Sequence, residues 1–211
     1  MSVKLLDMEK YARRAHFSYF RTLPYPYAGV TVDVDVKDAL CYAREKKRSF
    51  YLTILHAAAL AADEVPEFRQ RIRGEQIAEY SECPTSHVEL PDGRNYCYCT
   101  LYHHMDIDEY FERAEKTRRD CVLNGITEAP EVESMYFIST VPWFRYTALV
   151  QPAAGGDESN PRITWGKFEE DGTGRMMMPV SVLVHHALVD GIQIARFYQN
   201  LDLQIRRFGE M

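Results

Sequence analysis

The sequence predicts an α/β (α+β) protein in which helices pack against a mixed β-sheet. Helix-like and strand-like segments both occur, and they do not alternate strictly along the chain. Apolar residues make up 46% of the chain and charged residues 27%, which is typical of a globular protein. A length of 211 residues is enough for one substantial core, so we expect residues 1–211 to form a single domain.

The first third of the chain predicts three helices and one strand. Residues 8–20 have helical spacing and are followed by two prolines that end the helix. Residues 30–36 alternate β-branched and polar side chains, the period of a strand with one buried face. Residues 37–47 form the second predicted helix. Residues 50–65, rich in alanine and leucine, form a third and more buried one that stops before a proline.

The middle of the chain predicts short strands and one long helix. Glycine- and proline-containing turns separate four strands at residues 71–73, 76–80, 87–90 and 95–102. Residues 107–123 then have the charged, amphipathic pattern of a surface helix.

The last third predicts four strands and a closing helix. Two strands, at residues 135–139 and 144–150, flank a Val-Pro-Trp sequence. After a polar loop, residues 161–168 and 175–186 form the last two strands, joined by an Asp-Gly-Thr-Gly turn. Residues 192–208 have helical periodicity and end the fold.

Charge and cysteine content exclude some classes of partner and indicate a cellular compartment. The formal net charge is −6 and the sequence pI about 5.7, with no basic block, so we expect no nucleic-acid or membrane partner. There is no run of roughly 18 apolar residues that would span a bilayer. Lys4 interrupts the short apolar start, which is unlike a signal peptide. Five irregularly spaced cysteines predict free thiols in a reducing cytoplasm.

The most informative segment is His-His-Ala-Leu-Val-Asp-Gly at residues 185–191. It joins an apolar strand to a helix. A histidine at the end of a buried strand is held rigidly and is partly desolvated, which suits a general base. Neighbouring side chains on a strand point to opposite faces, so His185 and His186 cannot chelate one metal together. Asp190 is a candidate N-cap of the helix. Two structural histidines are the alternative interpretation.

This segment resembles the signature of the chloramphenicol acetyltransferases. More loosely, it resembles that of a superfamily with dihydrolipoyl acyltransferase cores, carnitine acyltransferases and peptide-synthetase condensation domains. Four further stretches resemble elements of the chloramphenicol acetyltransferases in the same order: Tyr-Ala-Arg-Arg-Ala-His-Phe at 11–17, Phe-Tyr at 50–51 with Pro-Glu-Phe-Arg at 66–69, Phe-Ile-Ser-Thr-Val-Pro-Trp at 137–143 and Ile-Thr-Trp-Gly-Lys at 163–167.

The resemblance implies a reaction and roles for particular residues. His186 would be the general base that deprotonates a substrate hydroxyl as it attacks acetyl-CoA, the co-substrate. Ser139 would donate to the oxyanion of the tetrahedral intermediate, and Thr164 would assist there, through water. Asp190 would pair with Arg13 and hold the site together rather than transfer protons. No metal is expected in the reaction.

The resemblance also implies binding sites and an assembly. Relatives are homotrimers with active sites between subunits, where one subunit supplies the base and its neighbour much of the acceptor pocket. Trp143 would flank the coenzyme channel, unless it is a packed core indole. The expected acceptor-pocket residues are Tyr19, Phe20, Pro24, Pro26, Ala28 and Leu149. A hydrophobic plug is the alternative role for the aromatic residues of this segment.

Several functions stay open beside acetylation of chloramphenicol. Well-known drug-modifying members carry Cys and Phe where Pro26 and Ala28 stand, so a different small alcohol or amine is one alternative acceptor. A dihydrolipoyl acyltransferase core is another, although the chain has no Ala/Pro-rich linkers. A catalytically silent, ligand-binding relative is the third.

Elsewhere, we expect His103 and His104 to form a solvated pair and arginines 69, 71 and 73 to form a solvated edge.

Overall fold

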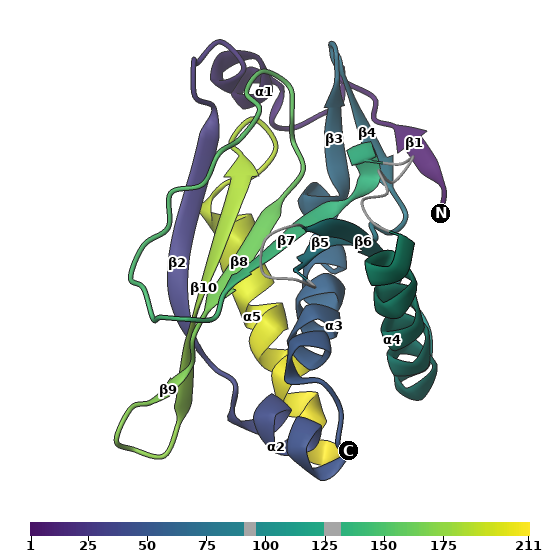
Figure 1. Cartoon of the computed structure of the whole chain (residues 1–211). Coiled ribbons are helices and arrows are strands. Elements are labelled where there is room, and N and C mark those ends of the chain that lie inside the picture. The colour runs from purple at the N-terminus through teal and green to yellow at the C-terminus, as the bar shows by residue number, and fades with distance from the viewer. Residues whose placement is uncertain (91–95, 125–131) are drawn as a thin grey trace.

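The computed structural model describes residues 1–90, 96–124 and 132–211 and shows two β-sheets with helices packed against the larger one (Figure 1). The strands are β1 (Val3–Leu5), β2 (Tyr27–Asp35), β3 (Gln70–Arg73), β4 (Gln76–Tyr80), β5 (Thr85–Glu89), β6 (Cys97–Leu101), β7 (Tyr136–Val141), β8 (Arg162–Gly166), β9 (Glu169–Glu170) and β10 (Met176–His185). The α-helices are α1 (Arg14–Phe20), α2 (Lys37–Glu45), α3 (Phe50–Asp63), α4 (Ile107–Asn124) and α5 (Gly191–Arg207). Short 3-10 turns are η1 (Pro66–Arg69), η2 (Val132–Ser134) and η3 (Phe208–Glu210).

The large sheet is mixed, as the sequence predicts. Its strand order is β2-β10-β8-β7-β5-β6, with β9 paired to β10. Strand β7 runs parallel to both β5 and β8, whereas the other pairs are antiparallel. The small sheet has the order β1-β4-β3. Long β10 lies between β2 and β8 and ends at His185, so the sheet carries the His-His segment to one of its ends.

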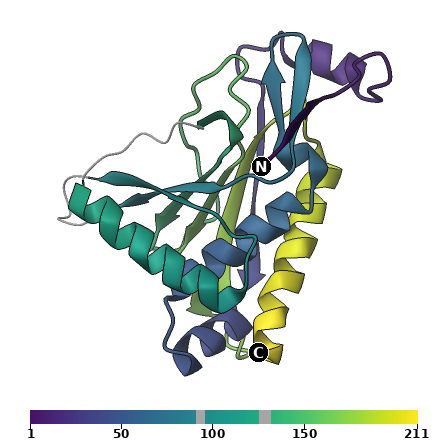
Figure 2. The ribbon, with the colours of Figure 1, turned by 90° about the vertical axis from the view of Figure 1, so that its right-hand side faces the viewer.

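Helices α3 and α5 lie side by side and cover one face of the large sheet (Figure 2). Helix α3 is buried almost all round because its alanines allow close approach on several sides. Helix α5 is amphipathic and turns Ile194, Phe197 and Leu201 toward the core. Its Tyr198 hydroxyl donates to the carbonyl of Val180 (2.8 Å), which ties the helix to β10. No helix among the described residues is both long and apolar enough to cross a membrane.

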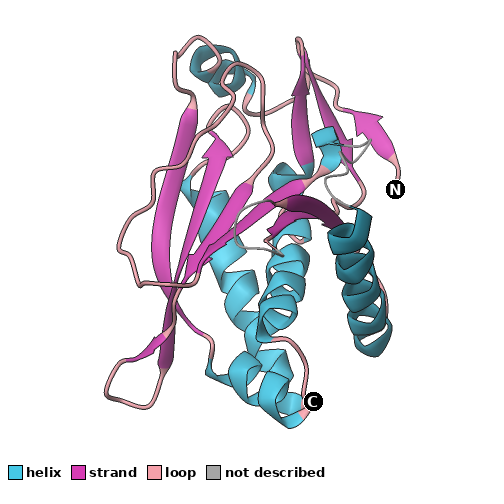
Figure 3. Ribbon diagram, in the orientation of Figure 1, coloured by secondary structure: helices cyan, strands magenta, loops and turns pink. Residues whose placement is uncertain are grey.

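The long connection between β7 and β8 differs from the prediction, since residues 144–150 form no strand. Strands β7 and β8 hydrogen-bond directly to each other in parallel, so no position between them is open. The segment instead runs past β2 before it returns to the sheet (Figure 3). Much of it is exposed, and Val150 keeps 94% of its surface accessible.

Two N-terminal elements also differ from the prediction. Helix α1 begins at Arg14, not at residue 8, because the preceding residues form separate turns closed by Asp7–Lys10 and Tyr11–Arg14 backbone bonds. Strand β1 was not predicted. It is three residues long and pairs with β4, so its conformation depends on a distant partner rather than on its own pattern.

Arg71 corrects the prediction of a solvated arginine edge. Its side chain is 1% exposed. Its guanidinium donates to the carbonyls of Phe68, Gln70, Glu133 and Met135 at 2.7–3.0 Å. Carbonyl acceptors supplied by neighbouring turns satisfy the buried charge, which the spacing of the arginines alone does not show.

Candidate active site

His186 lies in the turn between β10 and α5, one residue beyond the end of the strand. Its backbone N–H donates to the carbonyl of Pro26 (2.7 Å), so the chain entering β2 fixes the turn. Asp190 is the N-cap of α5, and its N–H donates to the side-chain oxygen of Gln193 (2.9 Å). The predicted strand-to-helix turn is therefore present, held at both ends by hydrogen bonds.

The imidazole of His186 has one nitrogen engaged with backbone. Its Nδ1 lies 2.9 Å from the carbonyl oxygen of Val189 and 3.2 Å from a carboxylate oxygen of Asp190. Both partners are acceptors, so Nδ1 carries the hydrogen and Nε2 of the neutral ring keeps its lone pair. The Phe20 ring stacks on the imidazole with centroids 3.9 Å apart. The His186 side chain remains 32% exposed, so it is accessible and not packed in the core.

His185 has a different environment. Its ring is buried, and its Nε2 donates to the carbonyl of Gly156 (3.1 Å) while Nδ1 accepts from the N–H of Ala187 (3.2 Å). Burial lowers the pKa of His185, which disfavours the charged form. Both nitrogens are occupied, so of the two histidines only His186 presents a free lone pair.

Arg13, at the N-cap of α1, connects the N-terminal part of the chain to the His186 turn. Its Nη1 and Nη2 groups donate to the two carboxylate oxygens of Asp190, and Nη2 also donates to the carbonyl of His186 (3.3 Å). This forked pair is partly buried, with side-chain exposures of 16% for Arg13 and 33% for Asp190. The fork fixes Asp190 and the His186 backbone together.

We expect Asp190→Asn to lower activity by displacing the turn that carries His186. The amide loses the charge and one acceptor, so the cost is about 1–3 kcal/mol, less than for a fully buried pair. The free energy of unfolding in urea and the turnover number, measured for Asp190→Asn and for Arg13→Lys, check this prediction. A crystal structure of Asp190→Asn with the turn unmoved and turnover abolished would contradict the positioning role.

Ser139 and Thr164 belong to a row of hydroxyls that crosses four strands. Ser139 on β7 pairs with Thr164 on β8, which pairs with Ser181 on β10 and then Thr31 on β2. Thr164 Oγ1 donates to the side-chain oxygen of Gln151 (3.2 Å). The Ser139 side chain is exposed and lines a pocket of about 250 Å³ with Gln151. Of the row, Ser139 lines this hollow, whereas Thr164 is buried beside it and Thr31 and Ser181 line a separate pocket.

One chain does not bring the row of hydroxyls to the imidazole. His185 lies four residues beyond Ser181 on β10, which corresponds to about 14 Å along the strand. Ser139 lies a further two strands across, about 10 Å. A single reacting carbonyl cannot contact both Ser139 and His186 of the same chain.

The six predicted acceptor-pocket residues are only partly gathered. Phe20 stacks on His186, and Pro26 contacts it through its backbone carbonyl. Leu149 lines a pocket of about 240 Å³ with Tyr25, Tyr27 and Ser181. Of the six, Leu149 alone lines this pocket. Tyr19 is exposed on α1, Pro24 is exposed in the connection to β2, and Ala28 lies on β2 opposite Val184.

Trp143 is exposed over 72% of its surface, which contradicts the alternative of a core indole.

Gln151 and Tyr146 are functional candidates that sequence reasoning missed. Tyr146 donates to the carbonyl of Thr164 (3.0 Å) and lies against Gly166, where a Cβ would approach its ring to 2.8 Å. The sequence signal would have been a tyrosine within the predicted strand at residues 144–150 and a glutamine directly after it.

The interpretation of His103 and His104 as a solvated pair is wrong. His103 is 3% exposed, and Nε2 of each histidine lies against the same oxygen of Asp63, at 2.8 Å and 2.6 Å. The Asp63 carboxylate comes from the end of α3, a contact some forty residues away that the sequence does not reveal.

The fold is that of a class of acyltransferases. A solved chloramphenicol acetyltransferase structure superposes with a TM-score of 0.84 at 22% identity, covering 97% of this chain and 100% of that one. A probable dihydrolipoamide acetyltransferase from Listeria monocytogenes superposes with a TM-score of 0.69 at 13% identity, covering 97% and 94%. The predicted mixed-sheet fold class is confirmed.

Within that class, the chain belongs to the chloramphenicol acetyltransferase family, whose sequence model matches residues 1–202. The chloramphenicol acetyltransferase of Proteus mirabilis is 24% identical over 207 residues, covering 95% of this chain and 94% of the relative. Chloramphenicol acetyltransferase 3 of Escherichia coli is 26% identical over 210 residues, covering 95% and 96%. The resemblance inferred from the five motifs is confirmed, and the chain is an acyltransferase.

Proposed function

We propose that this protein transfers acetyl from acetyl-CoA to a hydroxyl of chloramphenicol or a similar small acceptor. The observation that carries this proposal is the His186 imidazole, whose Nδ1–H is held by the Val189 carbonyl while Nε2 keeps an accessible lone pair. A base with a fixed tautomer and a partly exposed ring suits proton removal from a bound hydroxyl.

Each of the three catalytic residues has a separate role in the proposed reaction. His186 Nε2 accepts the hydroxyl proton as the oxygen attacks the thioester carbonyl carbon. Ser139 Oγ–H donates to the resulting oxyanion, and Thr164 supports it from the same row. When the carbon–sulfur bond breaks, the imidazolium returns its proton to the departing thiolate, so His186 is regenerated. No acyl-enzyme and no metal takes part, and exposed Trp143 offers an apolar surface beside the coenzyme.

A homotrimer with active sites between subunits fits the geometry of the chain. Ser139 and His186 of one chain are too far apart to act on one carbonyl, so a neighbouring subunit has to supply one of them. Strand β2 is an edge of the large sheet, and it exposes Val30 (45%) and Val32 (36%). Exposed apolar side chains at a sheet edge favour association with another copy. We place the assembly in the cytoplasm.

A different small alcohol or amine is the second candidate acceptor. It is favoured by Pro26 and Ala28, which stand where the family resemblance implies Cys and Phe in well-known drug-modifying members.

Release of thiol from acetyl-CoA in the presence of chloramphenicol tests the proposal. We expect acceptor-dependent release that His186→Ala abolishes. Release with other hydroxyl or amine compounds, but not with chloramphenicol, would favour the second acceptor class. No acceptor-dependent release across a broad panel would contradict transfer and indicate a catalytically silent ligand-binding relative.

A further inference from the structure

A second group of polar side chains lies outside the active site. Asp63 at the end of α3 meets His103 and His104 in the connection between β6 and α4. One carboxylate oxygen and the two Nε2 atoms all lie within 4.8 Å of one another. We propose that these three residues bind one divalent transition-metal ion, of which Zn²⁺ is the best match to two imidazoles and a carboxylate.

The carboxylate of Asp63 is oriented before any ion binds. Its Oδ1 accepts from the hydroxyl of Tyr136 (2.6 Å) and from the N–H of Cys83 (3.2 Å). Oδ2 therefore faces the two histidines. Such hydrogen bonds to the non-coordinating oxygen are typical of carboxylates that ligate metals, because they fix the ligand's direction.

The two imidazoles converge because the backbone turns between them and α4. The N–H of Met105 donates to the carbonyl of His103 (3.0 Å), which curls the connection. Consecutive side chains then aim Nε2 at one oxygen, with ring centroids 4.6 Å apart. Adjacent residues on a regular strand would point apart, so this convergence depends on the turn.

The charge at the site favours a cation. Asp63 is buried and, in the part of the chain that the structure describes, pairs with no lysine or arginine side chain. The Nε of nearby Arg69 donates to the backbone carbonyl of Asp63 instead (2.8 Å). A buried carboxylate whose partners are neutral donors and imidazoles gains from a positive ion at that position.

Binding requires small movements only. Metal–ligand bonds of about 2.0–2.2 Å in a tetrahedral site place ligand atoms about 3.3 Å apart, roughly 0.6 Å wider than the present hydrogen bonds. Each neutral imidazole then carries its hydrogen on Nδ1. For His103 the bond from Nε2–H to Asp63 is replaced by the bond to the metal. Its Nδ1 has no hydrogen-bond partner among the described residues, so the metal bond also has to offset a buried donor without an acceptor. The His104 side chain is 45% exposed, which gives an entry path and leaves room for a water ligand.

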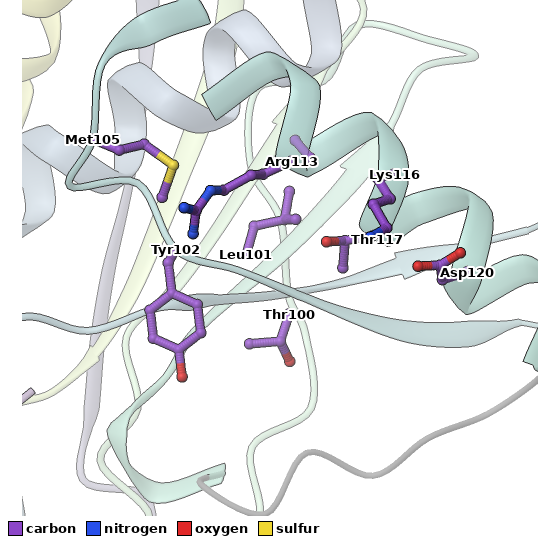
Figure 4. Close-up of a pocket in the computed structure, with 9 residues that line it drawn as sticks. Thr100, Leu101, Tyr102, Met105, Arg113, Lys116, Thr117 and Asp120 are labelled. Carbon is purple, nitrogen blue, oxygen red and sulfur yellow. The ribbon is translucent and has the colours of Figure 1, made fainter. Parts of the chain in front are cut away.

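The ion would act as a structural clamp, because it joins α3 to the β6–α4 connection. The same connection contributes Tyr102 and Met105 to a separate pocket of about 460 Å³ between β6 and α4 (Figure 4). Arg113 and Lys116 also line that pocket, whereas His103 and His104 do not. The proposed ion site is therefore distinct from this hollow.

Titration of chelator-treated protein with Co²⁺ and with Zn²⁺ tests the site. We expect one equivalent per chain, the visible absorption of a tetrahedral Co²⁺ centre, and a rise in Tm of about 5 °C or more at saturating Zn²⁺. His104→Gln should weaken binding at least about tenfold. His16→Gln, a change at an exposed histidine in α1, should not.

Absence of binding by the unaltered protein, or equal binding by His104→Gln, would overturn the proposal. A second measurement needs no variant. Bound Zn²⁺ should protect His104 from diethylpyrocarbonate, as read by mass spectrometry. Equal labelling of His104 with and without Zn²⁺ would show that the three residues form a hydrogen-bonded cluster only.

Discussion

His186→Ala is expected to lower kcat by about 10²–10⁴-fold, because an alcohol is a poor nucleophile unless its proton is removed during attack. Affinity for acetyl-CoA should change little, since in the proposed mechanism the ring acts only on the reacting hydroxyl and on the departing sulfur, not on the rest of the coenzyme. Stability should fall only modestly, because the side chain is one-third exposed and what is lost outside its own turn is the stacking on the Phe20 ring.

Steady-state kinetics with a saturating acceptor measure this effect, with Lys46→Gln as the control. Lys46 is exposed at the C-terminal end of α2, and its loss should leave kcat close to that of the unaltered protein. A folded His186→Ala variant that retains kcat within a few-fold would mean that another group removes the proton.

Ser139→Ala is expected to lower kcat by about 10²–10³-fold while KM for the acceptor stays nearly constant. In the proposed mechanism the hydroxyl donates to charge that exists only in the transition state, so its loss should affect the rate rather than substrate binding. Ser139 is exposed in the chain, so its truncation creates no core cavity.

Ser139→Thr is the matched variant because it keeps a hydroxyl at the same Cβ. It should retain much of the activity that Ser139→Ala loses. Equal activity of Ser139→Ala and the unaltered protein would remove Ser139 from the mechanism. A fall in both Ser139→Ala and Ser139→Thr with a raised KM would indicate a packing role instead.

Local pattern predicted the elements that form their own structure. The alanine-rich helix at residues 50–65 appears as α3, and the amphipathic segment at 107–123 appears as α4. The alternating strand at 30–36 is present in β2, which extends it toward the N-terminus. In these segments the side-chain period alone specifies which face is buried.

The errors occur where conformation depends on distant partners. Residues 144–150 have a strand-like composition, but the direct pairing of β7 with β8 leaves them outside the sheet. His103 and His104 are polar in sequence, yet the carboxylate of Asp63 draws them together in a largely buried cluster. The sequence pattern within one segment does not predict which distant residues will contact it.

The candidate site was predictable from sequence to a similar extent. The turn at residues 185–191 specifies its own geometry, including the N-cap Asp190. The partnership of Arg13 with Asp190, by contrast, followed from the family resemblance, since the two residues are 177 positions apart. The hydroxyl row from Ser139 to Thr31 became visible only with the strand register, because it requires the order of four strands.

The central claim is that His186 of one subunit and Ser139 of another act on the same carbonyl. Co-expressing His186→Ala and Ser139→Ala chains with different affinity tags, and purifying the mixed assemblies, tests it most directly. In a mixed trimer one of the three sites combines an intact His186 with an intact Ser139, so the mixed assemblies should have about a third of the activity of the unaltered protein. If the mixed assemblies are no more active than either variant alone, the two groups do not meet across a subunit interface.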